Sequence, residues 1–130
     1  MKTNIFILFL FCSLSTMYVM SQTKNLEKPD VKDTWNLQEI YPDDEAWNVA
    51  KSNFAEKMKK ITSFKGKLTQ SAETLADALQ FQSEITKDFY RLYSYASMKS
   101  DQDTRVSKYL SMKQEISQLG TEYSSLASYI

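Results

Sequence analysis

A stripe of apolar residues at helical spacing constrains the fold of this chain more than any other feature. Towards the C-terminal end the apolar positions follow one another at alternating intervals of three and four residues: Tyr109, Met112, Ile116, Leu119, Tyr123, Leu126 and Ile130. This is the repeat of an α-helix that buries one side against a neighbouring helix. Because a half-buried strand would alternate every second residue instead, the stripe predicts an all-α fold.

Two more helices are predicted upstream. The first is capped by Asp43 or Asp44 and presents one apolar face: Trp47, Ala50, Phe54, Met58 and Ile61. The second is capped by Ser71 and runs to Met98 without Gly or Pro, as one long helix or as two short ones joined by a bend. Its apolar face comprises Leu75, Ala78, Leu79, Ile85, Phe89, Leu92 and Ala96. We expect an antiparallel helical hairpin or bundle of about three helices.

Two details of this bundle can be tested directly. A polar turn at 100–103 separates the second and third helices, and Asp103 or Thr104 is predicted to cap the third. Gly120 interrupts the third helix at a cost of about 1 kcal/mol relative to Ala. We expect a tolerated defect or the close approach of a neighbouring helix there, rather than a functional hinge.

The N-terminal segment has the layout of a secretory signal peptide. Lys2 supplies a positive charge, an apolar run follows over residues 5–14, and Ser21 precedes a plausible cleavage point before Gln22. An uncleaved anchor and lipidation of Cys12 are the alternatives. Residues 1–21 are therefore predicted as a signal peptide and 22–33 as a flexible leader. The chain is expected to be exported to the periplasm or the extracellular space, with no membrane attachment after cleavage.

The composition excludes several kinds of chemistry. The sequence contains no His, and its one Cys lies in the predicted signal peptide. A His-based triad, a His-ligated zinc site and a thiolate nucleophile are therefore excluded from residues 22–130. We expect no catalytic residue, metal or cofactor in this chain. The formal net charge is zero, which gives no electrostatic argument for nucleic acid as a partner.

Three segments together resemble the N-terminal region of oligoendopeptidase F, a zinc metallopeptidase of the thimet-oligopeptidase class. They are Thr34-Trp35-Asn36-Leu37 with Ile40-Tyr41 and Trp47, then Phe64-Lys65-Gly66-Lys67-Leu68 leading into Ser71-Ala72, and finally residues 91–101 (RLYSYASMKSD) with Asp103 and Thr104. The order and the separations of the three segments carry the resemblance, which covers about residues 34–130.

The resemblance implies a helical N-terminal lobe that packs over a catalytic domain and helps to wall a channel for short peptides. In that family zinc is held by a His-Glu-x-x-His helix and a later Glu, and no such motif occurs here. The zinc site and the oligopeptide substrate would therefore belong to a full-length enzyme, whose missing catalytic domain is the expected partner. This chain alone is expected to be inactive. Tyr93 and Tyr95 are the candidates for the channel wall.

Two alternatives to the peptidase lobe are a free-standing exported helical module and a catalytically dead regulator. The module would bind or oligomerise through the stripe on the third helix. The regulator would compete for a surface of the enzyme's own partner. The oligomeric state and the size of the natural protein distinguish the module from the peptidase lobe, whereas only co-purification with a partner would support the regulator.

Overall fold

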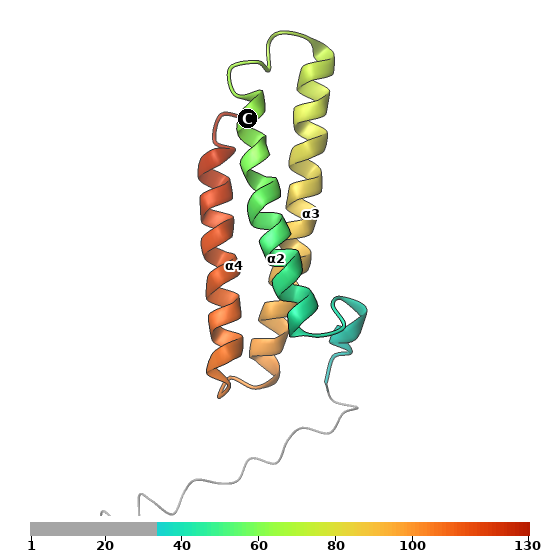
Figure 1. The fold of residues 1–130 in the computed structure, drawn as a ribbon, viewed down its shortest axis with the longest axis vertical. Coiled ribbons are helices and arrows are strands. Elements are labelled where there is room, and N and C mark those ends of the chain that lie inside the picture. Colours follow the sequence, from blue (N-terminus) through green and yellow to red (C-terminus); the bar gives the residue numbers. More distant parts are fainter. Residues whose placement is uncertain (1–33) are drawn as a thin grey trace, which may run out of the picture. The chain divides into compact units, whose positions relative to one another are not determined.

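The computed structural model describes residues 34–130, which fold into three helices packed side by side (Figure 1). These are α2 (Asp44–Lys59), α3 (Ala72–Gln102) and α4 (Ser107–Leu126), with short 3-10 helices η3 (Leu37–Glu39) and η4 (Lys60–Phe64). The all-α prediction is confirmed, because residues 34–130 contain no strand. The predicted signal peptide, its cleavage between Ser21 and Gln22, and the leader lie outside the described residues. Within 34–130 no helix is long and apolar enough to cross a membrane.

Helix α2 begins directly after Asp43, one of the two cap residues predicted from the sequence. The Asp43 carboxylate accepts a hydrogen bond of 2.8 Å from the backbone N–H of Ala46, one of the donors that a helix start leaves unpaired. Asp44 and Glu45 in the first turn and Lys57 and Lys59 in the last complement the helix dipole. The predicted inner face is buried at Trp47, Phe54 and Met58, and it continues into η4 through Ile61.

Helix α3 is a single continuous helix of 31 residues, which decides between the two alternatives left open by the sequence. The Ser71 hydroxyl caps it by accepting a 3.0 Å hydrogen bond from the Thr74 N–H. Most of the predicted apolar face is buried or half-buried, but Leu75 and Leu79 are 40% and 47% exposed. Their assignment to the core is therefore wrong. Helix α3 extends beyond the end of α4, so its first turns have no α4 residues beside them (Figure 1).

The turn between α3 and α4 differs from the prediction. Helix α3 continues to Gln102, and α4 starts at Ser107 after Val106, so neither Asp103 nor Thr104 caps it. The Asp103 carboxylate instead accepts hydrogen bonds from the backbone N–H and the guanidinium of Arg105, at 3.0 and 2.8 Å. These short-range bonds stabilise the turn itself and leave the cap position to Val106.

The stripe on α4 packs into the bundle. Met112 and Ile116 are buried, and Tyr109, Leu119 and Tyr123 pack half-buried against the same core, whereas Ile130 at the end is exposed. Figure 1 shows α3 and α4 running in opposite directions around the turn, which confirms the predicted antiparallel hairpin.

Gly120 marks a close approach between α3 and α4. A Cβ atom at this position would lie 2.5 Å from Cε2 and 2.7 Å from Cζ of Phe89, closer than any ordinary contact between carbon atoms. The Phe89 ring also lies against Phe54 and Tyr93, with centroid separations of 6.1 and 5.8 Å. Of the two structural explanations offered for this glycine, close approach of a neighbouring helix is correct.

Candidate functional site

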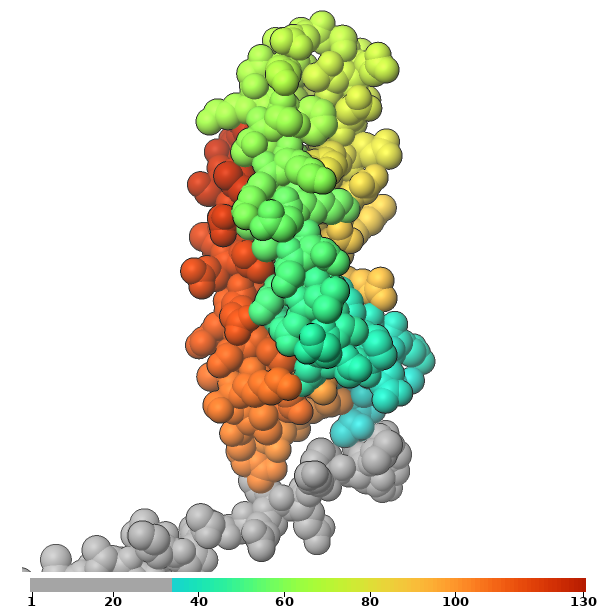
Figure 2. Space-filling model, in the orientation of Figure 1, coloured from blue at the N-terminus to red at the C-terminus, as the bar shows by residue number. Residues whose placement is uncertain are grey.

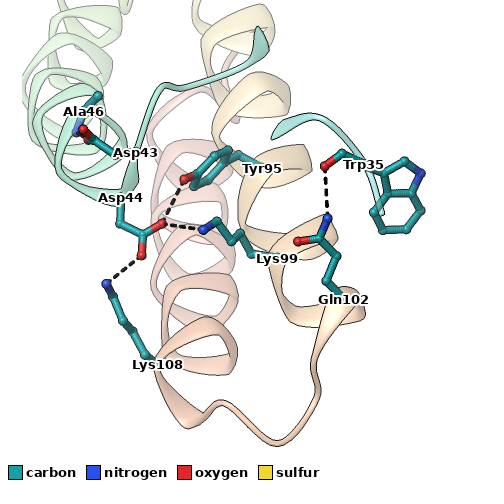
Figure 3. Close-up of polar contacts among 8 residues, drawn as sticks. All are labelled: Trp35, Asp43, Asp44, Ala46, Tyr95, Lys99, Gln102 and Lys108. Atoms are coloured by element: carbon teal, nitrogen blue, oxygen red, sulfur yellow. Dashed lines mark hydrogen bonds and ion pairs between the residues drawn. The ribbon is translucent and has the colours of Figure 1, made fainter. Parts of the chain in front are cut away.

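The main polar cluster of the bundle surrounds the Asp44 carboxylate at the start of α2 (Figure 3). The Tyr95 hydroxyl donates to Oδ1 of Asp44 at 2.8 Å, and Nζ of Lys99 lies 3.2 Å from the same oxygen. Nζ of Lys108 donates to Oδ2 at 2.6 Å. Because Tyr95 and Lys99 come from α3 and Lys108 from α4, one carboxylate ties the three helices together.

The protonation states in this cluster follow from burial and charge. Burial alone would raise the pKa of the Asp44 carboxyl, but hydrogen bonds from Lys108, Tyr95 and Lys99, with the charge of Lys99, lower that pKa below its ordinary value. Burial, followed by the hydrogen bond and negative charge of Asp44, raises the pKa of the Tyr95 phenol. Asp44 is thus ionised and Tyr95 neutral near pH 7, a stable arrangement in which neither group is poised to exchange a proton.

The segment before α2 is held on the same end of the bundle. The Gln102 side-chain amide donates to the Trp35 carbonyl at 3.2 Å, as Figure 3 shows, while the Trp35 ring itself is 51% exposed. The Arg91 guanidinium donates to the Ile40 carbonyl at 2.8 Å and lies 5.1 Å from the centroid of the Tyr41 ring. Two of the three segments that carry the family resemblance, 34–47 and 91–104, therefore contact each other.

A buried hydrogen bond fixes α2 on α3 one turn further along. The Trp47 indole N–H donates to the Leu92 carbonyl at 2.9 Å, and both side chains are buried. A buried indole needs such a partner, since an unpaired N–H would be costly. Sequence reasoning placed Trp47 in the core but could not identify its acceptor, which lies 45 positions away.

The two tyrosines proposed for a channel wall occupy different environments. Tyr95 is 1% exposed, its hydroxyl is bonded to Asp44, and its ring meets that of Tyr41 edge-to-face at 5.4 Å. Tyr93 is half-buried and stacks on Phe89. Within residues 34–130 Tyr95 is thus a core residue. The channel itself involves the rest of an enzyme, so that assignment stays a prediction.

A shallow groove runs between α3 and α4 on another side of the bundle. One part of it has a volume of ≈ 400 Å³ and lies between Phe89 and Tyr90 of α3 and Gly120 and Thr121 of α4. Thr86 and Tyr90 also line an adjoining hollow of ≈ 470 Å³ that extends along α3 to Leu79. Gln82, Ser83 and Lys87 also line this hollow, so the surface mixes apolar, hydroxyl-bearing and charged side chains.

The described part of the chain offers no constellation for metal chemistry. Among residues 34–130 no group of three or more His, Cys, Asp or Glu side chains could hold a metal ion. The Asp44 cluster has one carboxylate opposite two ammonium groups, which stabilises the bundle and leaves no ligand set for a cation.

Comparison with known proteins identifies similar sequences among bacterial peptidases. The chain is 36% identical over 110 residues to oligopeptidase PepF of Bacillus subtilis, a match that covers 85% of this chain. It is 39% identical over 77 residues to the chromosomal oligoendopeptidase F of Lactococcus lactis subsp. cremoris, covering 58% of the chain. The group B oligopeptidase PepB of Streptococcus agalactiae is 28% identical over 95 residues.

These matches span only a small part of each relative. The aligned region is 16% of the Bacillus protein, 16% of the streptococcal protein and 13% of the lactococcal protein. No family model matches the chain, and no solved structure matches it. The relatives are thus several times longer than the region they share with this chain.

Proposed function

Since this chain is an N-terminal oligoendopeptidase F-like region, we propose that it forms the non-catalytic helical lobe of an exported zinc metalloendopeptidase that hydrolyses oligopeptides. The observation that carries the proposal is the match with Bacillus subtilis PepF, which extends over 85% of this chain but only 16% of the relative. The activity would belong to the larger protein, and residues 34–130 would contribute a rigid helical part.

Zinc, if the larger protein uses it, would be held outside the described residues. Residues 34–130 provide no ligand set for a metal, and His is absent from the whole sequence. The metal would supply Lewis-acid activation of water and of the scissile carbonyl. The role of this chain would be to shape the peptide channel. Of the two tyrosines predicted for the channel wall, Tyr93 is half-buried and Tyr95 is buried, so Tyr93 is the better candidate.

The alternative of an independent module that dimerises through the third-helix stripe has less support. Met112 and Ile116, at the centre of that stripe, are buried against α2 and α3 within the same chain. A face already occupied inside its own bundle is not available to a second copy.

The size of the native protein tests the proposal. An antibody against residues 34–130 is used for immunoblotting of the cells that make the protein. We expect a band several-fold larger than this chain, and the purified product should cleave oligopeptides in a chelator-sensitive way, whereas the 130-residue chain should not. A single band at the size of this chain would contradict the proposal. Sequencing the N-terminus of the purified product would test export, since cleavage before Gln22 removes the signal peptide.

A further inference from the structure

We propose that the side of α3 bearing Leu75 and Leu79, together with the groove below it, is the surface on which a segment following Ile130 in the larger peptidase docks. The inference rests on the proposed function, because it needs a larger polypeptide. It adds the location of the contact and the residues that make it.

The first step is the geometry of α3. Leu79 and Leu75 precede Thr86 by seven and eleven residues, two and three helical turns, so the three residues share one side of the helix. Thr86 lines the groove beside α4. The side of α3 that borders α4 near Thr86 therefore carries Leu79 and Leu75 closer to the start of α3. That part of α3 lies beyond the end of α4 (Figure 1).

The second step is the character of this surface. Leu75, Leu79 and Tyr90 are 40%, 47% and 60% exposed, and Leu79 and Tyr90 both line the hollow that continues into the groove. Gln82, Ser83 and Lys87 line the same hollow, so the exposed leucines lie at the apolar end of a mixed surface. A helix side with apolar side chains one turn apart, such as Leu75 and Leu79, can accept apolar anchors of another segment.

The third step concerns the occupant. The aligned region is 16% of the length of the Bacillus relative, so in a protein of that length most of the polypeptide lies outside residues 34–130. Helix α4 ends at the same end of the bundle at which α3 begins, and the Tyr129 hydroxyl is hydrogen-bonded to the Ile61 carbonyl there. Figure 2 shows the start of α3 standing above the end of α4. A polypeptide that continues from Ile130 would start at the same end of the bundle as the exposed leucines, and its attachment would raise its effective concentration there.

Photo-crosslinking in the full-length protein tests this inference. A photoreactive residue, p-benzoylphenylalanine, replaces Leu79 in one sample and Val49 in another. Val49 is a matched control, since it is apolar, 53% exposed and located on α2. We expect the probe at 79 to give crosslinked peptides from beyond residue 130 in several-fold higher yield than the probe at 49.

A thermal-unfolding comparison supplies a second readout. In the 130-residue chain Leu79→Lys and Val49→Lys should shift the midpoint by similar small amounts, because both side chains are exposed. In the full-length protein Leu79→Lys should lower it by several degrees more than Val49→Lys. Equal shifts, or crosslinks from 79 only to residues 34–130 or to a second copy, would overturn the inference. Absence of any larger product on the immunoblot would instead remove the proposed function, so the two failures are distinguishable.

Discussion

Replacing Gly120 by Ala sets two opposing effects against each other in α4. In the interior of a helix, Ala is favoured over Gly by about 0.8–1.0 kcal/mol, so the change would stabilise an isolated helix. In this bundle the new methyl group would lie 2.5 Å from Cε2 of Phe89. An ordinary carbon–carbon contact is about 3.5–4.0 Å, so the ring would have to move by about 1 Å.

The surroundings of the ring decide which effect prevails. Phe89 lies between Phe54 and Tyr93, with centroid separations of 6.1 and 5.8 Å, so a shift disturbs two aromatic contacts. Overpacking of this kind costs about 1–3 kcal/mol. After subtraction of the helix-propensity gain, we expect Gly120→Ala to lower the free energy of unfolding by about 1 kcal/mol, with about 2 kcal/mol as the upper end.

Urea unfolding of the 130-residue chain, followed by far-UV circular dichroism, measures this difference. Thr121→Ala is the matched control: its exposed side chain lies one position away, and the change should stabilise the helix by about 0.5 kcal/mol. A double-mutant cycle with Phe89→Leu isolates the clash, because Gly120→Ala should become neutral or stabilising once the ring is gone. If Gly120→Ala stabilises the protein equally with and without Phe89, the close approach is not what selects glycine.

Three further predictions follow from the hydrogen bonds of the bundle. Asp44→Asn should lower the free energy of unfolding by about 1–2 kcal/mol in urea titrations, because Lys99 and Lys108 lose a charged acceptor; a loss below the error of the titration would mean that the cluster is screened by solvent. The pKa of Asp44 is lower in the folded protein than its unfolded value of about 3.9. The ionised carboxylate therefore contributes fully to the free energy of unfolding above the unfolded pKa, and this contribution is lost as the pH falls through the folded pKa. The stability difference between wild type and Asp44→Asn should accordingly shrink in thermal melts taken between about pH 5 and pH 2, and a constant difference would contradict the shift. Trp47→Phe should cost about 1–3 kcal/mol, since it leaves the buried Leu92 carbonyl without its indole donor and removes ring volume; an unchanged urea midpoint would show that another donor replaces it.

The parts of the fold that were predictable are those set by neighbours in the sequence. Asp43 and Ser71 cap their helices through backbone groups three residues away, so the type and position of each residue sufficed. The buried faces of α2 and α4 follow from the three- and four-residue spacing of apolar side chains. For Gly120 the sequence left a tolerated defect and a close approach of a neighbouring helix as alternatives, and nothing in it pointed to Phe89 as the neighbour.

The parts that could not be predicted depend on where one helix ends beside another. Leu75 and Leu79 have the same periodicity as Ile85 and Leu92, and they differ only because α4 ends before it reaches them. The Asp44 cluster joins residues 51 to 64 positions apart, a separation at which a single sequence carries no pairing signal. The same applies to the candidate surface on α3, which the sequence assigned to the core.

The turn at 103–106 has a consequence for the order of events during synthesis. It makes α3 and α4 consecutive partners, so their packing requires only a short loop to close. Contacts between neighbouring helices form quickly, in microseconds to milliseconds, whereas a ribosome adds about 5–20 residues per second. In a longer polypeptide this hairpin would therefore be complete while later segments are still being made. Those segments would then assemble on a preformed scaffold whose exposed leucines are already in place.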